Sequence, residues 1–131
     1  MIVVDSSALV AILTLEPDAP AFLRIVTEAR SKLISAVSLL ETSMVLAARK
    51  NNSDIWHTLD TFLAKAELEV IAFDPEQALL ARGAFIRFGK GRHPAGLNLG
   101  DCAAYALAKS RSLPLLFKGN DFCKTDISAA L

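Results

Sequence analysis

The sequence is short of cysteine, has no excess of charge of either sign, and contains no apolar stretch long enough to cross a bilayer. Its two cysteines, Cys102 and Cys123, lack metal-site spacing and are expected to be free thiols in a cytoplasmic protein. The start Met-Ile-Val-Val-Asp lacks the basic residues that open a signal peptide. Secreted, membrane-spanning and disulfide-stabilised proteins are therefore not expected.

Charge balance removes another simple indication of function. The chain has 14 Lys and Arg residues and 14 Asp and Glu residues, so its formal net charge is zero. Whole-chain electrostatics therefore point to no nucleic-acid partner, and any such site must come from local clustering. Little charge is left to oppose self-association, which is compatible with a homo-oligomer.

What the sequence does contain is typical of one ordered domain spanning residues 1–131. Hydrophobic residues make up 53% of its 131 positions and charged residues 21%, which argues against disorder. Short apolar runs alternate with helical patterns, as in an α/β fold with a central parallel sheet. Strands are predicted at Ile2–Val4, Lys32–Ile34, Leu68–Ile71 and Pro114–Phe117. Helices are predicted at Ser7–Leu15, Pro17–Ala29, from Ser35 or Ser38 to Lys50, Ile55–Lys65, Asp74–Phe88 and Leu99–Ser110, with a turn at Asn51–Ser53.

Two acidic residues have positions that solubility alone does not explain. Asp5 follows the first strand, where wound α/β sheets bind ligands, although an aspartate there can also cap the next helix. Glu41 falls within an apolar helical stripe. Because burying an unpaired carboxylate costs several kcal/mol, a buried Glu41 would need a cation, either a basic side chain or a metal. The stripe consists of Val37, Leu40, Met44, Val45 and Ala48.

Two further acids extend the pattern. Asp101 lies in the first turn of a helix so apolar that it must be central, where the helix dipole favours an acid by about 0.3–1 kcal/mol. Asp121 follows the last strand, in turn-forming sequence. Each position has an adequate structural explanation, but together the four acids could converge on one edge of a sheet. Such a cluster of oxygen ligands suits Mg²⁺ or Mn²⁺, which activate water against phosphodiesters.

A locally basic segment complements these acids. No acid occurs between Glu76 and Asp101, and a loop at residues 89–98 leads directly into the Asp101 helix. Basic side chains of this kind can hold backbone phosphates, although a solvated helix face and loop would have the same composition. The predicted phosphate contacts are Arg82, Arg87, Lys90, Arg92, His93 and Lys118.

Four segments together resemble the motifs of PIN domains, and most closely those of VapC toxins from bacterial type II toxin–antitoxin pairs. The resemblance runs in order from the first strand to the last. The segments are Val3-Val4-Asp5-Ser6-Ser7-Ala8-Leu9, Ser38-Leu39-Leu40-Glu41-Thr42, Leu97-Asn98-Leu99-Gly100-Asp101-Cys102 and Leu115-Leu116-Phe117-Lys118-Gly119-Asn120-Asp121-Phe122.

The resemblance implies a three-layer α/β/α sandwich and Mg²⁺- or Mn²⁺-dependent cleavage of RNA, with tRNA and rRNA as frequent targets. It also implies a homodimer and inhibition by a small VapB-type antitoxin. Asp5, Glu41, Asp101 and Asp121 would be the catalytic, metal-binding acids, and Ser7 would help order the site. Asn120 stands where many relatives carry a further acid, which makes it an accessory position here.

Two other functions fit part of this sequence pattern. An aspartate-nucleophile phosphatase also begins with a strand and an Asp, but it needs a second acid where this chain has Ser7. A catalytically inactive PIN-like module that binds RNA or protein is the alternative. The presence of all four acids favours the endoribonuclease.

Overall fold

The computed structural model describes residues 1–50 and 54–131. The predicted turn at Asn51–Ser53 lies outside the described residues. Within the described part of the chain, no helix is both long and apolar enough to cross a membrane. The strands are β1 (Ile2–Val4), β2 (Lys32–Ser35), β3 (Leu68–Ile71) and β4 (Leu115–Leu116). The helices are α1 (Ser6–Leu13), α2 (Ala19–Glu28), α3 (Ala36–Lys50), α4 (Asp54–Lys65), α5 (Pro75–Phe88), α6 (Leu99–Arg111) and the 3₁₀ turn η1 (Phe122–Lys124).

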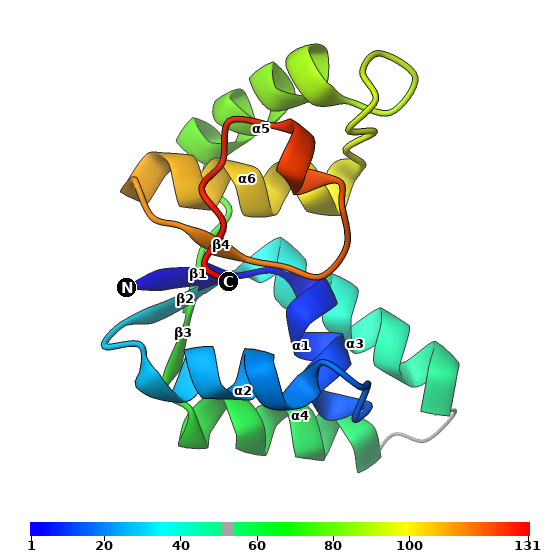
Figure 1. Ribbon diagram of the computed structural model, residues 1–131, viewed down its shortest axis with the longest axis vertical. Coiled ribbons are helices and arrows are strands. Elements are labelled where there is room, and N and C mark those ends of the chain that lie inside the picture. The colour runs from blue at the N-terminus through cyan, green and yellow to red at the C-terminus, as the bar shows by residue number, and fades with distance from the viewer. Residues whose placement is uncertain (51–53) are drawn as a thin grey trace.

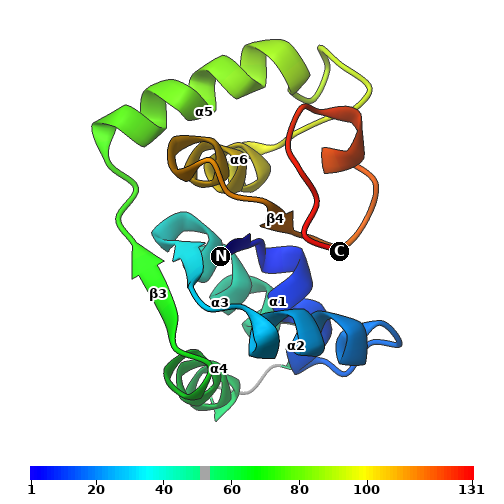
Figure 2. The same ribbon diagram turned by 60° about the vertical axis from the view of Figure 1, so that its left-hand side comes forward.

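The four strands form one parallel sheet in the order β3-β2-β1-β4. Val3 of β1 stands opposite Leu33 of β2 on one side and Leu115 of β4 on the other. Figure 2 shows β3 at the edge of the sheet that lies away from β4. A parallel sheet is covered on both faces, which is why β1 and β4 are continuous apolar runs rather than alternating ones.

Successive strand residues point to opposite faces of the sheet and divide the core into two clusters. Val3, Leu33 and Leu115 pack against α5 and α6. Val4, Ile34 and Leu116 pack on the other face, against helices α1 to α4. Figure 1 shows these as two helical layers with the sheet between them. The predicted three-layer α/β/α sandwich is confirmed.

The sequence signals for helix starts are also confirmed. Asp74 caps α5, its side chain accepting from the backbone N–H of Gln77 at 2.9 Å, and Pro75 takes the first helical position. Helix α6 is central, as its apolar sequence predicted, because every residue from Cys102 to Ala108 is buried. Several boundaries were wrong: α1 ends at Leu13 and not at Leu15, α2 begins at Ala19 and not at Pro17, and the predicted strand Pro114–Phe117 shrinks to Leu115–Leu116.

The C-terminal segment is fixed to α6 by Asp126. Its carboxylate accepts from the Tyr105 hydroxyl at 2.6 Å and pairs with Lys109 at 3.0 Å. The pKa of Asp126 is lowered by these contacts and by the charge of Arg87, against the opposing effect of partial burial. Asp126 therefore stabilises the packing of the C-terminal segment on α6.

Candidate active site

The strand order places a topological switch point between β1 and β4, because the chain winds from β1 to β3 in one direction and returns to the other side of β1 for β4. Ligands of open α/β sheets bind beyond the carboxyl ends of strands at such a point. Asp5 immediately follows β1, and its backbone N–H donates to the Leu116 carbonyl of β4 at 2.9 Å. The first acid of the predicted site thus lies at the switch point.

Asp5 is 2% exposed, and only one of its two carboxylate oxygens has a hydrogen-bond partner. Its Oδ2 accepts from the Ser7 backbone N–H at 3.0 Å and from the Ser7 hydroxyl at 2.6 Å, which makes Asp5 the N-cap of α1. Its Oδ1 is buried with no hydrogen-bond partner. Burial raises the pKa of Asp5 to about 7, helped by the negative charges of Asp101 and Glu41 and opposed by the two bonds from Ser7. A buried, unpartnered carboxylate oxygen is a position that a cation would satisfy.

Ser7 connects Asp5 to the end of β4. While the Ser7 hydroxyl donates to Asp5, its oxygen accepts from the backbone N–H of Lys118 at 2.9 Å. The ammonium of Lys118 in turn contacts Glu16 at 3.0 Å and Asp18 at 3.2 Å. These bonds hold the loop after β4 against α1. They also occupy the Lys118 side chain, one of the predicted phosphate contacts.

Asp101 combines a structural role with a place among the acids. It forms a capping box with Asn98: its Oδ2 accepts from the Asn98 backbone N–H at 3.1 Å, and its own N–H donates to Asn98 Oδ1 at 2.9 Å. Burial, helped by the charges of Asp121 and Glu41 and opposed by the hydrogen bond from Asn98, raises the pKa of Asp101 to about 6. One carboxylate oxygen therefore fixes the start of α6, and the residue still interacts with two other site acids.

The environment of Glu41 corrects a sequence-based prediction. The apolar stripe of α3 does not face the core, because Leu40 and Met44 are 60% and 62% exposed, and Glu41 is only half buried. The buried face of α3 instead carries Thr42 and Leu46. Helical periodicity identifies a stripe, but it cannot say whether that stripe meets the core or an open groove. Here it lines a groove of about 340 Å³ bounded by Val37, Leu40, Glu41, Met44, Val45, Asn98, Leu99 and Gly100.

Because Glu41 is only half buried, it does not need the cationic partner that a buried glutamate would require. Among the side chains of residues 1–49 and 54–131, no basic group forms an ion pair with Glu41. Its Oε1 instead accepts from the Ser6 hydroxyl at 2.5 Å. Its carboxylate also lies against Gly100, where a Cβ would overlap both carboxylate oxygens. Sequence reasoning missed Ser6 and Gly100, although each stands beside an acid that it singled out.

Asp121 is the outermost of the four acids. It is exposed at the start of η1, without a side-chain capping bond, and Asn120 beside it is exposed too. Its charge raises the pKa of Asp101 but is not among the causes that raise that of Asp5. The structure therefore brings Asp5, Glu41 and Asp101 into mutual electrostatic contact, with Asp121 beside Asp101.

The donor set fits a hard divalent cation held in an open site. In the part of the chain that the structure describes, no three His, Cys, Asp or Glu side chains lie together as a group that could hold a metal ion. Mg²⁺ rarely needs three such ligands, since it keeps several waters and is usually held by one or two carboxylates and substrate phosphates. The free Oδ1 of Asp5 and the mutual repulsion of the acids are the features that such an ion would relieve.

The predicted phosphate contacts do not form one uniform strip. Arg87 contacts Asp126 at 3.5 Å and lies over the Phe88 ring, and His93 Nδ1 accepts from the Ala95 N–H at 3.0 Å. Lys90 and Arg92 are exposed in the loop that leads into α6. Figure 1 shows this loop on the side of the molecule where α6 begins. The Arg92 guanidinium lies over the Phe85 ring at 5.7 Å, as that of Arg87 lies over Phe88, and the role of Lys90 and Arg92 as phosphate contacts stays a prediction.

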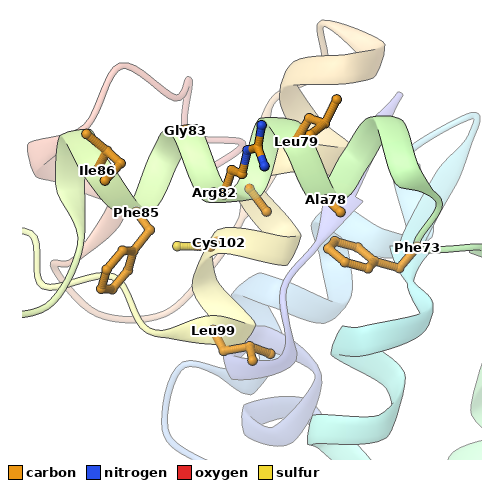
Figure 3. A pocket seen from close by; sticks show the side chains of 10 residues that line it. Phe73, Ala78, Leu79, Arg82, Gly83, Phe85, Ile86, Leu99 and Cys102 are labelled. Atoms are coloured by element: carbon orange, nitrogen blue, oxygen red, sulfur yellow. The ribbon is translucent and has the colours of Figure 1, made fainter.

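Arg82 lies elsewhere, at a large apolar groove along α5. The groove has a volume of about 830 Å³, and Figure 3 shows Phe73, Phe85, Leu99 and Cys102 around it. Ile86 and Leu99 are 60% and 77% exposed. Leu99 also borders the Glu41 groove, so the apolar surface is continuous from α5 to α3.

Comparisons with known proteins agree with this architecture. The PIN domain family model matches residues 2–128. The chain is 48% identical to VapC ribonuclease Mb0640 of Mycobacterium bovis over 126 residues, which is 96% of this chain and 95% of that protein.

Two solved structures share the fold. The crystal structure of Mycobacterium tuberculosis VapC20, a toxin that cleaves the sarcin-ricin loop, superposes with a TM-score of 0.79 at 15% identity, covering 97% of this chain and 96% of that one. VapBC2 from Rickettsia felis, bound to a DNA fragment from its promoter, gives a TM-score of 0.74 at 19% identity over 98% and 96%. The matching model and the 48% identity show that this chain belongs to the PIN domain family and, within it, to the VapC ribonucleases.

Proposed function

We propose that the protein is a Mg²⁺- or Mn²⁺-dependent endoribonuclease and the toxin of a type II toxin–antitoxin pair, with tRNA or rRNA as substrate. The observation that carries this proposal is the buried, unpartnered Oδ1 of Asp5 at the sheet's switch point, facing the charges of Asp101 and Glu41. The ribonuclease name of a relative 48% identical across nearly the whole chain supports the same reaction.

Asp5 and Asp101 would hold the metal, with Glu41 and Asp121 as the further acids of the site. When bound, Mg²⁺ or Mn²⁺ polarises a phosphodiester and acidifies the water that attacks it. Ser7 keeps Oδ2 of Asp5 occupied through its two hydrogen bonds, so Oδ1 is the oxygen left for a ligand. Lys90 and Arg92 would contact backbone phosphates, a sequence-independent and salt-sensitive contribution to RNA binding. Asn120 would be accessory.

The proposal includes a VapB-type antitoxin as partner and the cytoplasm as the place of action. A solved toxin–antitoxin complex from Klebsiella pneumoniae contains a chain of the same fold, with a TM-score of 0.70 at 18% identity, which supports the partner. Cys102 and Cys123 are both free, as a reducing compartment requires.

A homodimer formed through the apolar groove of α5 is part of the proposal, because this continuous apolar surface is lined by strongly exposed side chains. We expect the wild-type protein to be a dimer at micromolar concentration in light scattering, and Ile86→Asp to be a monomer. Leu15→Asp provides the control, since Leu15 is also apolar and even more exposed but lies outside the groove. Dimerisation that survives Ile86→Asp and is lost in Leu15→Asp would place the interface elsewhere.

The direct test is cleavage of total tRNA by purified, antitoxin-free protein in Mg²⁺, Mn²⁺ or EDTA. We expect cutting in either metal, none in EDTA, and a loss on the order of 1,000-fold in Asp5→Asn/Asp101→Asn, because a catalytic metal supplies several kcal/mol of transition-state stabilisation. Asp60→Asn, at an exposed acid of α4, should cut like the wild type. Wild-type protein that is folded and binds RNA but cuts no tRNA or rRNA with either metal would instead support the RNA-binding module.

A further inference from the structure

The carboxylate of Glu41 is contacted by residues of two other elements. On one side the Ser6 hydroxyl, in the first turn of α1, donates to Oε1 at 2.5 Å. On the other side the carboxylate packs so closely on Gly100 of α6 that a Cβ there would overlap it. Three segments that are distant in sequence therefore meet at this one group.

The surroundings of Glu41 on helix α3 itself are open. The neighbours of Glu41 along the stripe, Leu40 and Met44, are largely exposed, and the side chain lies at the rim of an open groove. A free glutamate has several rotatable bonds, so ordering its side chain costs conformational entropy. The position of the carboxylate therefore depends on its two outside contacts.

Those two contacts come from the immediate neighbours of the other site acids. Ser6 follows Asp5 and Gly100 precedes Asp101. In the first turn of α1 the consecutive serines divide their bonds, Ser6 donating to Glu41 and Ser7 to Asp5. The Glu41 carboxylate therefore contacts the two segments that carry Asp5 and Asp101.

We propose that Ser6 and Gly100 are positioning residues that fix the Glu41 carboxylate relative to Asp5 and Asp101, so that its negative charge strengthens the binding of a divalent cation by those two acids. This inference rests on the proposed function. Residues that orient metal ligands through hydrogen bonds change metal affinity or activity by about 10- to 100-fold when they are removed. Ser6 supplies the hydrogen bond, and the missing side chain of Gly100 supplies the space.

The test is Mn²⁺ binding by calorimetry in a double-mutant cycle between position 6 and position 41. We expect Ser6→Ala to weaken Mn²⁺ binding about 10-fold in the wild-type background and less than twofold in Glu41→Ala, because Ser6 acts only through Glu41. Ser6→Thr, which keeps the hydroxyl, should restore most of the affinity. Ser43→Ala is the matched control, since the Ser43 hydroxyl on the same helix donates to the Leu39 carbonyl and does not contact Glu41.

Gly100→Ala gives a second and independent arm. The added methyl should displace the Glu41 carboxylate and weaken Mn²⁺ binding by a similar factor, whereas in Glu41→Ala, where the carboxylate is gone, it should have no effect on affinity. Ser6→Ala and Gly100→Ala costing the same with and without Glu41 would overturn the inference alone. Wild-type protein that binds no Mn²⁺ would overturn the proposed function, and this inference with it.

Discussion

Asp5→Asn is expected to stabilise the metal-free protein at pH 8 by about 1–3 kcal/mol while abolishing metal-dependent cleavage. Burial raises the pKa of Asp5 to about 7 in the folded protein, whereas an unfolded aspartate has a pKa near 3.9. The folded state thus favours the protonated form. The stability contributed by this group is fully present below about pH 4 and is lost as the pH rises towards 7.

The loss amounts to about 2–4 kcal/mol above pH 7, where the carboxylate is charged, buried and, at Oδ1, unpartnered. Asparagine is neutral at every pH and is as good an N-cap as aspartate, so its carbonyl can still accept from Ser7. Its amide group must occupy the place of Oδ1 without a partner, which is why the expected gain is smaller than the loss it removes.

Urea denaturation in EDTA at pH 5 and pH 8 measures this effect. The difference between Asp5→Asn and the wild type should be large at pH 8 and small at pH 5, while Asp60→Asn should shift stability little at either pH. A variant less stable than the wild type at pH 8 in EDTA would show that the Asp5 charge is already compensated within the protein. Higher stability together with lost activity would indicate that the Asp5 carboxylate destabilises the metal-free protein but is needed to bind the cation.

Metal affinity is expected to rise by about 10- to 100-fold between pH 5.5 and pH 7.5. Asp5 and Asp101 titrate at about 7 and about 6, so at pH 5.5 a cation must displace protons that are absent, or nearly so, at higher pH. Each displaced proton weakens apparent binding by up to about tenfold per pH unit. Removing the metal with EDTA should therefore lower the unfolding temperature more at pH 7.5 than at pH 5.5.

Calorimetric titration with Mn²⁺ in buffers of different ionisation enthalpy reports both the affinity and the protons released. We expect proton release between one and two at pH 5.5, and a flatter pH dependence in Asp101→Asn, which lacks one of the two titrating ligands. Asp60→Asn should keep the wild-type slope. Affinity that does not change with pH in the wild type would mean that neither carboxylate binds the ion.

The proposed function is also consistent with a site that does not enclose the cation with protein ligands. Among the described residues no three His, Cys, Asp or Glu side chains form a metal-binding group, so a cation held by one or two carboxylates would keep positions for water and for phosphate oxygens. The substrate can then complete the metal's shell, which is the usual arrangement where Mg²⁺ acts on phosphate esters. The groove beside Glu41 opens at the same rim.

The sequence alone determined the elements and the placement of the acids along them. Apolar runs and capping residues predicted all four strands and the helices from α1 to α6, because strand burial, Asp74-Pro75 and the apolar stretch of α6 act through local sequence. The same local signals placed Asp5 after β1 and Asp101 in the first turn of α6.

Only the tertiary structure decided which contacts those residues make. The stripe around Glu41 faces a groove rather than the core, since periodicity records a pattern and not what packs against it. Ser6 and Gly100 meet Glu41, and Arg87 turns to Asp126, through elements that only the folded sheet and helices bring side by side. Local propensity is fixed by neighbours in the chain, whereas a site is made by neighbours in space, and these depend on how the whole chain buries its apolar surface.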